Sequence, residues 1–587
     1  MVVKFRANRS LLTSRQPRAH RYADSPVLEL PMPAWRSRMV LMIIMVAFGA
    51  LLLRAFYLQV LNNDFLQEKG DSRYRRDMEI FASRGKITDR NGAALAVSTP
   101  MQSIWAFSDT AKLTPEEQKQ LAGILGMDVR ELGRKLSGDK NFVYLKRQVP
   151  PDIAAQVAAL KLKGVHQDRE YRRYYPTGDM TAHIVGFTGL DDKGLEGVEL
   201  AFQSSLMGRH GVRSVIKDNH ANIVEDVGAT KPPQDGKEVV LALDAKVQYL
   251  TFSYLKQAVL ENKARAGSAV VLDARTGEVL ALANWPTYNP NNRETLTGPE
   301  LRNRAVTDSF EPGSTMKPFT VALALEKHKV KPDSRIDCAP GRMTIGTATI
   351  SDAHPHGLLT VQQVIQKSSN VGTSKIALGF KPQEMWDMFD AVGFGRSPKL
   401  GFPGEISGRL RPAKNWVPIE QATMSYGHGI SVSLMQMARA YSVFARDGEL
   451  IPVSLVKMDS TDPPETKKVF SPETAKAMRL MLEMAAGPEG TAPLAQVAGY
   501  RVGGKTGTAY KVEHGVYAKK YVASFVGIAP ISDPRLIVAV MVDEPSGGKH
   551  YGGDVAAPVF SQIVGGALRT LGVTTDSPVV AAKGGRG

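Results

Sequence analysis

One long apolar segment constrains the fold of this 587-residue chain more than any other feature. The run Met39–Leu53 contains no polar side chain, and beyond Arg54 the apolar character continues to Leu61. As a helix, residues 39–61 would be about 34 Å long, enough to cross a bilayer core of about 30 Å. Arg54 and Tyr57 would then lie near one interface, where their polar ends reach water. We expect this helix to be the single membrane anchor, because no later run matches it in length and apolarity.

The segment before this helix is strongly basic. Residues 1–38 carry eight Lys or Arg against Asp24 and Glu29, a net charge of +6. Because basic flanks stay on the cytoplasmic side of a membrane, we expect a cytoplasmic arm over residues 1–38. A basic arm can also bind nucleic acid, but its position beside an anchor favours the membrane interpretation, and we expect no nucleic-acid partner. The alternative is a signal peptide cleaved near Ala47-Phe48-Gly49, which would need an unusually long basic region.

The chain offers little for metal or redox chemistry. Cys338 is the only cysteine, so no intrachain disulfide forms and hydrophobic cores must hold the fold. The histidines show no H-E-x-x-H spacing, and His354 and His356 are typical of a surface loop rather than a ligand pair. We therefore expect no metal and no cofactor.

Two hairpins indicate that the chain contains two sheets. Residues 84–96 are typical of strand, turn and strand, with Asn91-Gly92 supplying the positive φ angles of a tight turn. Residues 270–282 repeat the pattern around Gly277. Between them, residues 153–162 have a helical pattern, and the Pro- and Gly-containing stretch Lys231–Lys237 is typical of a linker.

The second half combines strands with helices. Ser471 and Pro472 are typical of a helix start, and Gly487 follows the last apolar turn of that helix. Strands are expected at residues 521–528 and 536–542, a helix at 557–568, and a disordered tail at 571–587. The sequence thus predicts an α+β fold, with helices on an antiparallel sheet in the second half and a separate, more elongated module before it.

Three short elements carry the candidate chemistry. They are Ser314-Thr315-Met316-Lys317, Ser368-Ser369-Asn370 and Lys505-Thr506-Gly507-Thr508. Each is a weak signal alone, but the ordered set is much more specific.

The first element pairs a nucleophile with a base. Ser314 would lie at a helix N-terminus, where free N–H groups favour developing negative charge, and Lys317 would lie one turn away on the same face. A serine hydroxyl needs a base to become a good nucleophile. Lys317 can accept its proton only if burial and a second cation lower its pKa. Lys505 is our candidate for that cation, and we expect Lys505 to remain charged.

The other two elements supply relay and binding groups. Ser368 can relay a proton, Asn370 can hold the substrate backbone and the lysine, and Ser369 should point elsewhere. In a strand over residues 502–510, Lys505 and Gly507 would share one face and Thr506 and Thr508 the other. Gly507 leaves room for a substrate backbone, the Thr hydroxyls suit a carboxylate, and the N–H groups of Ser314 and Thr508 would form an oxyanion hole.

In this order the elements resemble those of penicillin-recognising serine acyltransferases. The resemblance runs from the anchor to about residue 570 and is closest to class B penicillin-binding proteins, in particular the FtsI-type division-specific D,D-transpeptidases. Further stretches that carry it are Arg84–Gly92, Arg173-Tyr174-Tyr175-Pro176, Gly194–Glu199, Phe310–Gly313, Ser425-Tyr426-Gly427-His428-Gly429 and Ala556–Phe560.

The resemblance implies a domain order and an activity. It implies a periplasmic pedestal, or dimerisation-like, domain at residues 62–230 and a transpeptidase domain at 231–570. The expected reaction cross-links peptidoglycan stem peptides during septal cell-wall synthesis, through an acyl-enzyme on Ser314 formed with release of terminal D-Ala. β-Lactams would acylate the same serine.

The resemblance also implies a location and partners. We expect an inner-membrane protein with its catalytic domain in the periplasm, at the division septum. The expected partners are the stem peptides, the membrane, a septal lipid II-polymerising glycosyltransferase and other division proteins.

Four alternatives remain open from the sequence. A secreted β-lactamase would need a Glu-x-x-Leu-Asn stretch between Asn370 and Lys505, which is missing from the sequence. A bifunctional synthase would need a Glu-Asp-x-x-Phe signature in residues 62–230, which is missing too. The others are an elongation-type class B transpeptidase and a non-catalytic division scaffold.

Overall fold

The computed structural model divides the chain into two compact units. One unit comprises residues 1–78 and 214–228, and the other residues 79–213 and 229–587. Residues 1–32 of the predicted arm and 579–587 of the predicted tail lie outside the described residues. The structure describes residues 33–107, 111–137, 142–217, 223–294, 296–459, 464–513 and 515–578.

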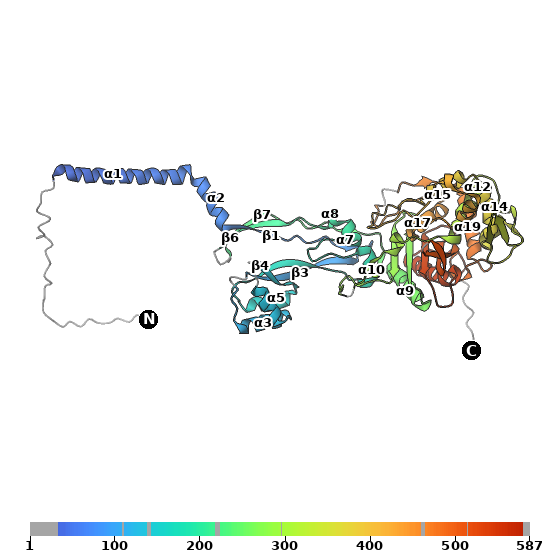
Figure 1. The fold of residues 1–587 in the computed structure, drawn as a ribbon, viewed down its shortest axis with the longest axis horizontal. Helices are drawn as coiled ribbons and strands as arrows, with labels where there is room; N and C mark the ends of the chain where they lie inside the picture. Colours follow the sequence, from blue (N-terminus) through green and yellow to red (C-terminus); the bar gives the residue numbers. More distant parts are fainter. Residues whose placement is uncertain are drawn as a thin grey trace, which may run out of the picture. The chain divides into compact units, whose positions relative to one another are not determined.

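The first unit contains the apolar helix. Helix α1 (Ala34–Phe56) continues as a π-helical turn (Tyr57–Leu61), and among the described residues this is the one span long and apolar enough to cross a membrane (Figure 1). It begins five residues before the predicted start, directly after Pro33. The Arg54 guanidinium lies 5.6 Å from the centre of the Tyr57 ring. Helix α2 (Asn63–Tyr74) follows, and strands β1 (Arg75–Ile80), β6 (Gly211–Lys217) and β7 (Ile223–Lys231) pair in that order.

The second unit begins with the predicted hairpin. Strands β2 (Ile87–Thr88) and β3 (Ala94–Phe107) are antiparallel, and Gly92 in the turn has a φ of +86°. Strands β4 (Phe142–Val149) and β5 (Val165–Tyr174) pair with β3, and the short β8 (Val239–Val240) lies parallel to β2. A small apolar core lies between this sheet and α3 (Pro115–Leu125), α4 (Val129–Leu136) and α5 (Pro151–Ala159).

A buried ionic cluster lies near the start of this unit. The Glu199 carboxylate accepts hydrogen bonds from Arg84 Nε at 2.6 Å and from Arg173 Nε at 2.7 Å, and all three side chains are at most 1% exposed. Buried charges persist only when paired, so this cluster joins the hairpin, β5 and the short helix that contains Glu199 through opposite charges. The short helices beside it are α6 (Ala182–Val185), α7 (Gly197–Ala201) and α8 (Gln203–Leu206).

The predicted linker at residues 231–237 is not a loose connection. Gly236 N donates to Ser83 O at 2.9 Å and Lys237 N donates to Ser205 O at 2.9 Å. A Cβ on Gly236 would lie 1.7 Å from Leu206 O, so the backbone packs where no side chain fits. The segment is thus fastened to the preceding residues by its backbone.

A five-stranded antiparallel sheet organises the rest of the unit. Its order is β10-β9-β19-β18-β17, so β17 lies at one edge. Because β17 contains Lys505–Thr508, the third sequence element lies at the edge of the sheet. The strands are β9 (Ala266–Asp273), β10 (Val279–Trp285), β17 (Gly503–Glu513), β18 (Val516–Ala529) and β19 (Leu536–Asp543).

Both faces of the sheet are buried. Along β19, Val538, Val540 and Val542 join the core formed with α9 (Ala245–Glu261) and α21 (Ala557–Thr570). Ile537, Ala539 and Met541 join the opposite core with α12 (Lys317–Glu326), α17 (Leu434–Ala440) and α19 (Pro472–Ala486). This alternation is the period of two that a strand imposes. It confirms the predicted α+β fold, with helices flanking an antiparallel sheet (Figure 1).

Several predicted elements have the expected ends. The Ser471 hydroxyl accepts from Thr474 N at the start of α19, and Gly487 follows its last residue.

The expectation of a disordered tail is wrong for residues 571–578, because Asp576 accepts from Arg501 N at 2.7 Å and from the Ser532 hydroxyl at 2.7 Å. The remaining elements are α10 (Gly298–Leu301), α11 (Arg304–Thr307), β11 (Arg335–Asp337), β12 (Arg342–Ile345), β13 (Ala348–Ser351), β14 (Leu358–Thr360), α13 (Val361–Gln366), α14 (Asn370–Leu378), α15 (Pro382–Ala391), α16 (Pro418–Met424), α18 (Ser442–Ala445), β15 (Glu449–Leu450), β16 (Lys467–Lys468) and α20 (Gly552–Val555).

Candidate active site

Ser314 lies in a tight turn that leads into a buried helix. The turn is a 3₁₀ helix over Gly313–Met316 and continues into α12 at Lys317, with Pro318 in the first turn of α12. Gly313 N donates to Gly427 O at 3.2 Å, so the loop after α16 supports the turn. Ser314 is half-buried, and its hydroxyl makes no hydrogen bond within the described residues. The hydroxyl is therefore available to a substrate.

Lys317 is fully buried beneath this turn. Its Nζ donates to Ser368 Oγ at 3.0 Å and also to the Ser368 carbonyl oxygen. Burial holds the pKa of Lys317 well below the usual 10.5, the nearby Lys505 lowers that pKa further, and Asp352 opposes both effects. The predicted causes are both present, but burial is complete and contributes most. The neutral form of this amine, which can accept a proton, is therefore favoured next to Ser368.

The second element presents Ser368 and Asn370 and buries Ser369. Ser368 has a φ of +61°, an unusual conformation for a residue with a side chain, and it points its hydroxyl at Lys317. Ser369 is 1% exposed and caps α14 by accepting from Gly372 N at 2.9 Å. The Asn370 amide donates to Ser351 O at 2.8 Å, and it makes no bond to Lys317 among the described residues.

Asp352 supports this element, and the sequence analysis did not identify it. Its Oδ2 accepts from the Ser369 hydroxyl at 2.8 Å, and its Oδ1 accepts from Val371 N at 2.9 Å. The carboxylate thus fixes the start of α14 and lies close enough to raise the pKa of Lys317. No spacing rule would have identified it, because Asp352 comes 17 residues before Ser369 and reaches it only through the fold.

Lys505 reaches the site from the edge strand. It is fully buried, and its Nζ donates to Thr506 Oγ1 at 3.3 Å. Burial lowers the pKa of Lys505 to about 7. The expectation that Lys505 simply remains charged therefore needs correction, since at neutral pH it is close to its midpoint. A carboxylate-bearing substrate would stabilise its charged form.

Strand β17 packs directly against the turn that carries Ser314. A Cβ on Gly507 would lie 2.7 Å from Pro312 O and 3.1 Å from Thr315 Cγ2, so only a glycine allows this approach. A Cβ on Gly313 would lie 3.5 Å from Thr508 N. The structure therefore brings the backbone of Thr508 beside Gly313, the residue that precedes Ser314. An oxyanion hole built from the N–H groups of Ser314 and Thr508 requires this approach.

The two threonines of this element already have partners. Thr506 Oγ1 lies 3.0 Å from Thr491 Oγ1, and Thr508 Oγ1 accepts from Gly552 N at 3.1 Å. Thr506 is buried and Thr508 is half-buried. The Thr508 hydroxyl is thus the more accessible of the two to a ligand carboxylate.

Comparisons with known proteins agree with this geometry. Residues 267–565 match the family model of the penicillin binding protein transpeptidase domain, and residues 79–241 match the penicillin-binding protein dimerisation domain. The chain belongs to the penicillin-binding transpeptidases. The predicted class B family and serine-type transpeptidase enzyme are thereby confirmed.

Relatives of this penicillin-binding protein match along almost its whole length. It is 43% identical to a probable peptidoglycan D,D-transpeptidase PenA of Neisseria gonorrhoeae, over 93% of this chain and 94% of the relative. It is 41% identical to the peptidoglycan D,D-transpeptidase FtsI of Escherichia coli K12, over 93% of each chain. The solved transpeptidase domain of Burkholderia pseudomallei penicillin-binding protein 3 is 53% identical and covers 58% of this chain and 98% of its own, with a TM-score of 0.54.

The family assignment also bears on the alternatives. The residues in which a bifunctional synthase would carry its glycosyltransferase match the dimerisation domain instead. Among the described residues, no group of three His, Cys, Asp or Glu side chains is placed to hold a metal ion. The groups that this penicillin-binding protein brings together at the site are serine and lysine side chains and backbone N–H groups.

Proposed function

We propose that this protein is a peptidoglycan D,D-transpeptidase whose nucleophile is Ser314. The observation that carries the proposal is the fully buried Lys317 amine, 3.0 Å from Ser368 Oγ, at the start of the helix that follows Ser314. A buried lysine with a depressed pKa is the base that a serine nucleophile needs. The substrate is a stem peptide that ends in D-Ala-D-Ala.

The first half-reaction forms the acyl-enzyme. Lys317 takes the Ser314 proton as Oγ attacks the carbonyl carbon of the penultimate D-Ala. The proton then passes through Ser368 to the amine of the terminal D-Ala, which leaves. The N–H groups of Ser314 and Thr508 stabilise the oxyanion, and losing one such donor typically costs about 10²–10³ in rate.

Binding groups orient the donor peptide. Lys505 in its charged form and the hydroxyls of Thr506 and Thr508 attract the terminal carboxylate. Asn370 contacts the peptide backbone, and Gly507 lets that backbone approach β17. A β-lactam presents a similar carboxylate and a reactive amide, so it acylates Ser314 instead.

The second half-reaction transfers the acyl group to an amine on a neighbouring strand. The Ser314 ester conserves the energy of the broken amide bond, so ATP, which is not available in the periplasm, is not needed. This protein accordingly carries out cross-linking, and a partner glycosyltransferase supplies the glycan strands.

The cellular setting follows from the anchor and the relatives. We propose a cytoplasmic N-terminus, an inner-membrane helix at residues 39–61, a periplasmic pedestal at 62–230 and a transpeptidase domain at 231–570. The relative named FtsI supports a role at the division septum with other division proteins. A fluorescent fusion that gathers at mid-cell would agree, and one confined to the side wall would favour an elongation-type enzyme.

Labelling with a fluorescent penicillin tests the nucleophile. Ser314→Ala should abolish covalent labelling, and mass spectrometry of the labelled wild type should place the adduct on Ser314. Ser253→Ala on α9 is the matched control and should label normally. Undiminished labelling of the Ser314 variant would show that the nucleophile lies elsewhere, and an unlabelled but folded wild type would favour a non-catalytic scaffold.

A further inference from the structure

Glu311 links two walls of the site three residues before Ser314. Its Oε1 accepts from Gly429 N at 2.8 Å, and its Oε2 accepts from the Tyr517 hydroxyl at 3.1 Å. Gly429 belongs to the loop after α16, whereas Tyr517 is on β18. The Glu311 side chain is only 14% exposed. A nearly buried carboxylate is thus held in one position between helical and sheet elements.

His428 is held beside this carboxylate. Its Nδ1 lies 3.6 Å from Glu311 Oε2, and its ring lies between Tyr426 at 5.3 Å and Tyr517 at 6.0 Å, measured between ring centres. The preceding residue, Gly427, contacts the Gly313 backbone so closely that a Cβ there would lie 2.2 Å from Gly313 O. His428 is therefore fixed next to the turn that carries Ser314, and 24% of its side chain remains exposed to solvent.

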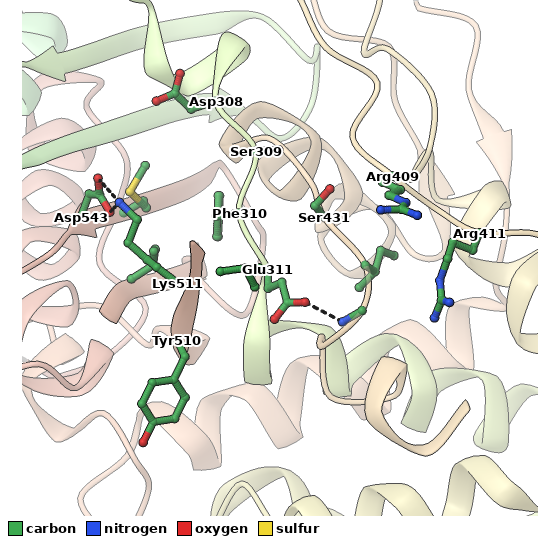
Figure 2. Close-up of a pocket in the computed structure, with 15 residues that line it drawn as sticks. Asp308, Ser309, Phe310, Glu311, Arg409, Arg411, Ser431, Tyr510, Lys511 and Asp543 are labelled. Carbon is green, nitrogen blue, oxygen red and sulfur yellow. Dashed lines mark hydrogen bonds and ion pairs between the residues drawn. The ribbon is translucent and has the colours of Figure 1, made fainter. Parts of the chain in front are cut away.

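A cavity of about 510 Å³ opens beside Glu311, which is one of its lining residues. Figure 2 shows Glu311 in its middle, with Tyr510 and Lys511 on one side and Arg409 and Arg411 on the other. The cavity is large enough for several residues of a peptide.

Most charges of the cavity are already paired. Lys511 bonds Asp543 at 2.8 Å, and Arg411 bonds Glu420 at 2.7 Å. Arg409 also lines the cavity and makes no ion pair within the described parts of the chain. The cavity thus offers a carboxylate at Glu311 for a cation and a guanidinium at Arg409 for an anion.

The proposed reaction leaves one proton unassigned. An alkyl amine has a pKa of about 10, so the acceptor arrives as an ammonium and must lose a proton before its nitrogen can attack. When the C–N bond forms and the C–Oγ bond breaks, a second proton of that nitrogen returns to Ser314 Oγ through Ser368 and Lys317. Those two residues therefore account for the second proton only.

We propose that this cavity binds the acceptor strand, with Arg409 facing a carboxylate of that strand, and that His428 takes the first proton from the acceptor ammonium. This inference rests on the proposed transpeptidase function. Glu311 attracts the ammonium, and an imidazole nitrogen of His428 accepts one of its protons and later releases that proton to solvent. The neutral amine then attacks the acyl carbon. Atoms and charge then balance over the cycle.

The surroundings of His428 suit this role. Burial lowers the pKa of His428, Lys317 lowers it further and Glu311 raises it, while the facing Tyr426 and Tyr517 have pKa values raised to about 12 and stay protonated. His428 is consequently neutral at pH 7 and free to accept.

The test separates the two half-reactions in the full-length protein. A thioester donor, N-benzoyl-D-alanyl-thioglycolate, acylates the enzyme, and added D-alanine competes with water to give amide or acid. In His428→Gln, amide formation should fall about 10²-fold. The fold-loss in amide formation should be at least ten times the fold-loss in the rate at which penicillin acylates the same sample. His328→Gln, an exposed histidine after α12, is the control and should keep the wild-type ratio.

A pH profile distinguishes proton transfer from a structural role. Wild-type amide formation should increase as the pH rises through the pKa of His428, and His428→Gln should lack that inflection. If the variant keeps both the inflection and the ratio of amide to acid, the inference is overturned. Equal losses of acylation and amide formation would also overturn it, because they would indicate a distorted site.

A second variant tests the anion-binding half of the proposal. Arg409→Gln should raise the half-saturating concentration of D-alanine about tenfold and that of D-alaninamide much less, because a charge-assisted hydrogen bond is lost only with the carboxylate. Arg335→Gln on exposed β11 is the control. Equal effects on both acceptors would overturn the role of Arg409. A wild type that neither donor nor penicillin acylates would instead overturn the transpeptidase proposal itself.

Discussion

Lys317 Nζ lies 3.0 Å from Ser368 Oγ, and both groups belong to elements that are 51 residues apart in the sequence. The fold itself makes this contact, so the two groups form a path for the serine proton. Because Lys317 is fully buried, losing its contact with Ser368 would be costly, since water cannot easily take the place of Ser368. The relay is therefore preorganised, and this arrangement leads to the first two predictions.

Acylation of Ser314 should follow a bell-shaped pH profile. The rising limb reports Lys317, whose pKa is held well below 10.5, because only the neutral amine accepts a proton. The falling limb reports Lys505, whose pKa burial lowers to about 7, because the neutral form no longer attracts a carboxylate. The measurement is the second-order rate of penicillin labelling between about pH 5 and pH 10.

The control for this profile is Lys505→Arg. A guanidinium stays charged throughout this range, so the falling limb should disappear while the rising limb remains. A falling limb that persists in the arginine variant would contradict the assignment of that limb to Lys505.

Ser368→Gly and Ser368→Ala should separate catalysis from backbone strain. Both variants remove the hydroxyl that Lys317 contacts, so both should lose about 10²-fold or more in labelling rate. Only glycine adopts the φ of +61° without strain, so the glycine variant should be more stable than the alanine variant by about 1 kcal/mol. Thermal unfolding of the detergent-solubilised protein measures this difference, and equal melting temperatures would argue against a strained Ser368.

Gly427→Ala should slow acylation of Ser314, although Gly427 belongs to none of the three sequence elements. The new Cβ would lie 2.2 Å from Gly313 O, so the turn that carries Ser314 must shift. We expect a loss of at least about tenfold in labelling rate and a destabilisation of about 2 kcal/mol or more. Gly346→Ala has a similar positive φ of +61° but open space around it, so it should cost only about 1 kcal/mol and label normally. Matching losses in the two variants would refute the steric explanation.

Glu199→Gln should strongly destabilise the protein without changing the labelling site. The substitution removes the carboxylate that bonds both buried arginines, Arg84 and Arg173, and breaking a buried ion pair typically costs about 3–5 kcal/mol. Glu196→Gln, at a half-buried neighbour without such an ion pair among the described residues, is the control and should cost less than about 1 kcal/mol. Denaturant unfolding of both variants provides the comparison, and similar midpoints would mean that the cluster contributes little.

Local patterns were sufficient to predict many elements of this protein. The Ser471 cap and Gly487 marked α19, Asn91-Gly92 marked the first hairpin, and an uninterrupted apolar run marked α1. These predictions succeed because capping, tight turns and membrane-length apolarity depend on residues a few positions apart. The order of the three short elements pointed to the site for a different reason, namely their resemblance to a known family.

The tertiary structure decided which groups act on one another. Asp352 fastens Ser369, Gly427 supports Gly313, and Glu311 holds His428, and none of these pairs follows from local spacing. The degree of burial of each side chain could not be predicted from local spacing either. Burial moves the pKa of Lys505 to about 7, although a charged lysine was expected.

By itself, then, the sequence determined the long apolar helix, the class of fold and the residue types available for acyl transfer, because each depends on local composition or family pattern. Only the folded chain determined the protonation, spacing and support of the site, because electrostatics and packing depend on distance in space.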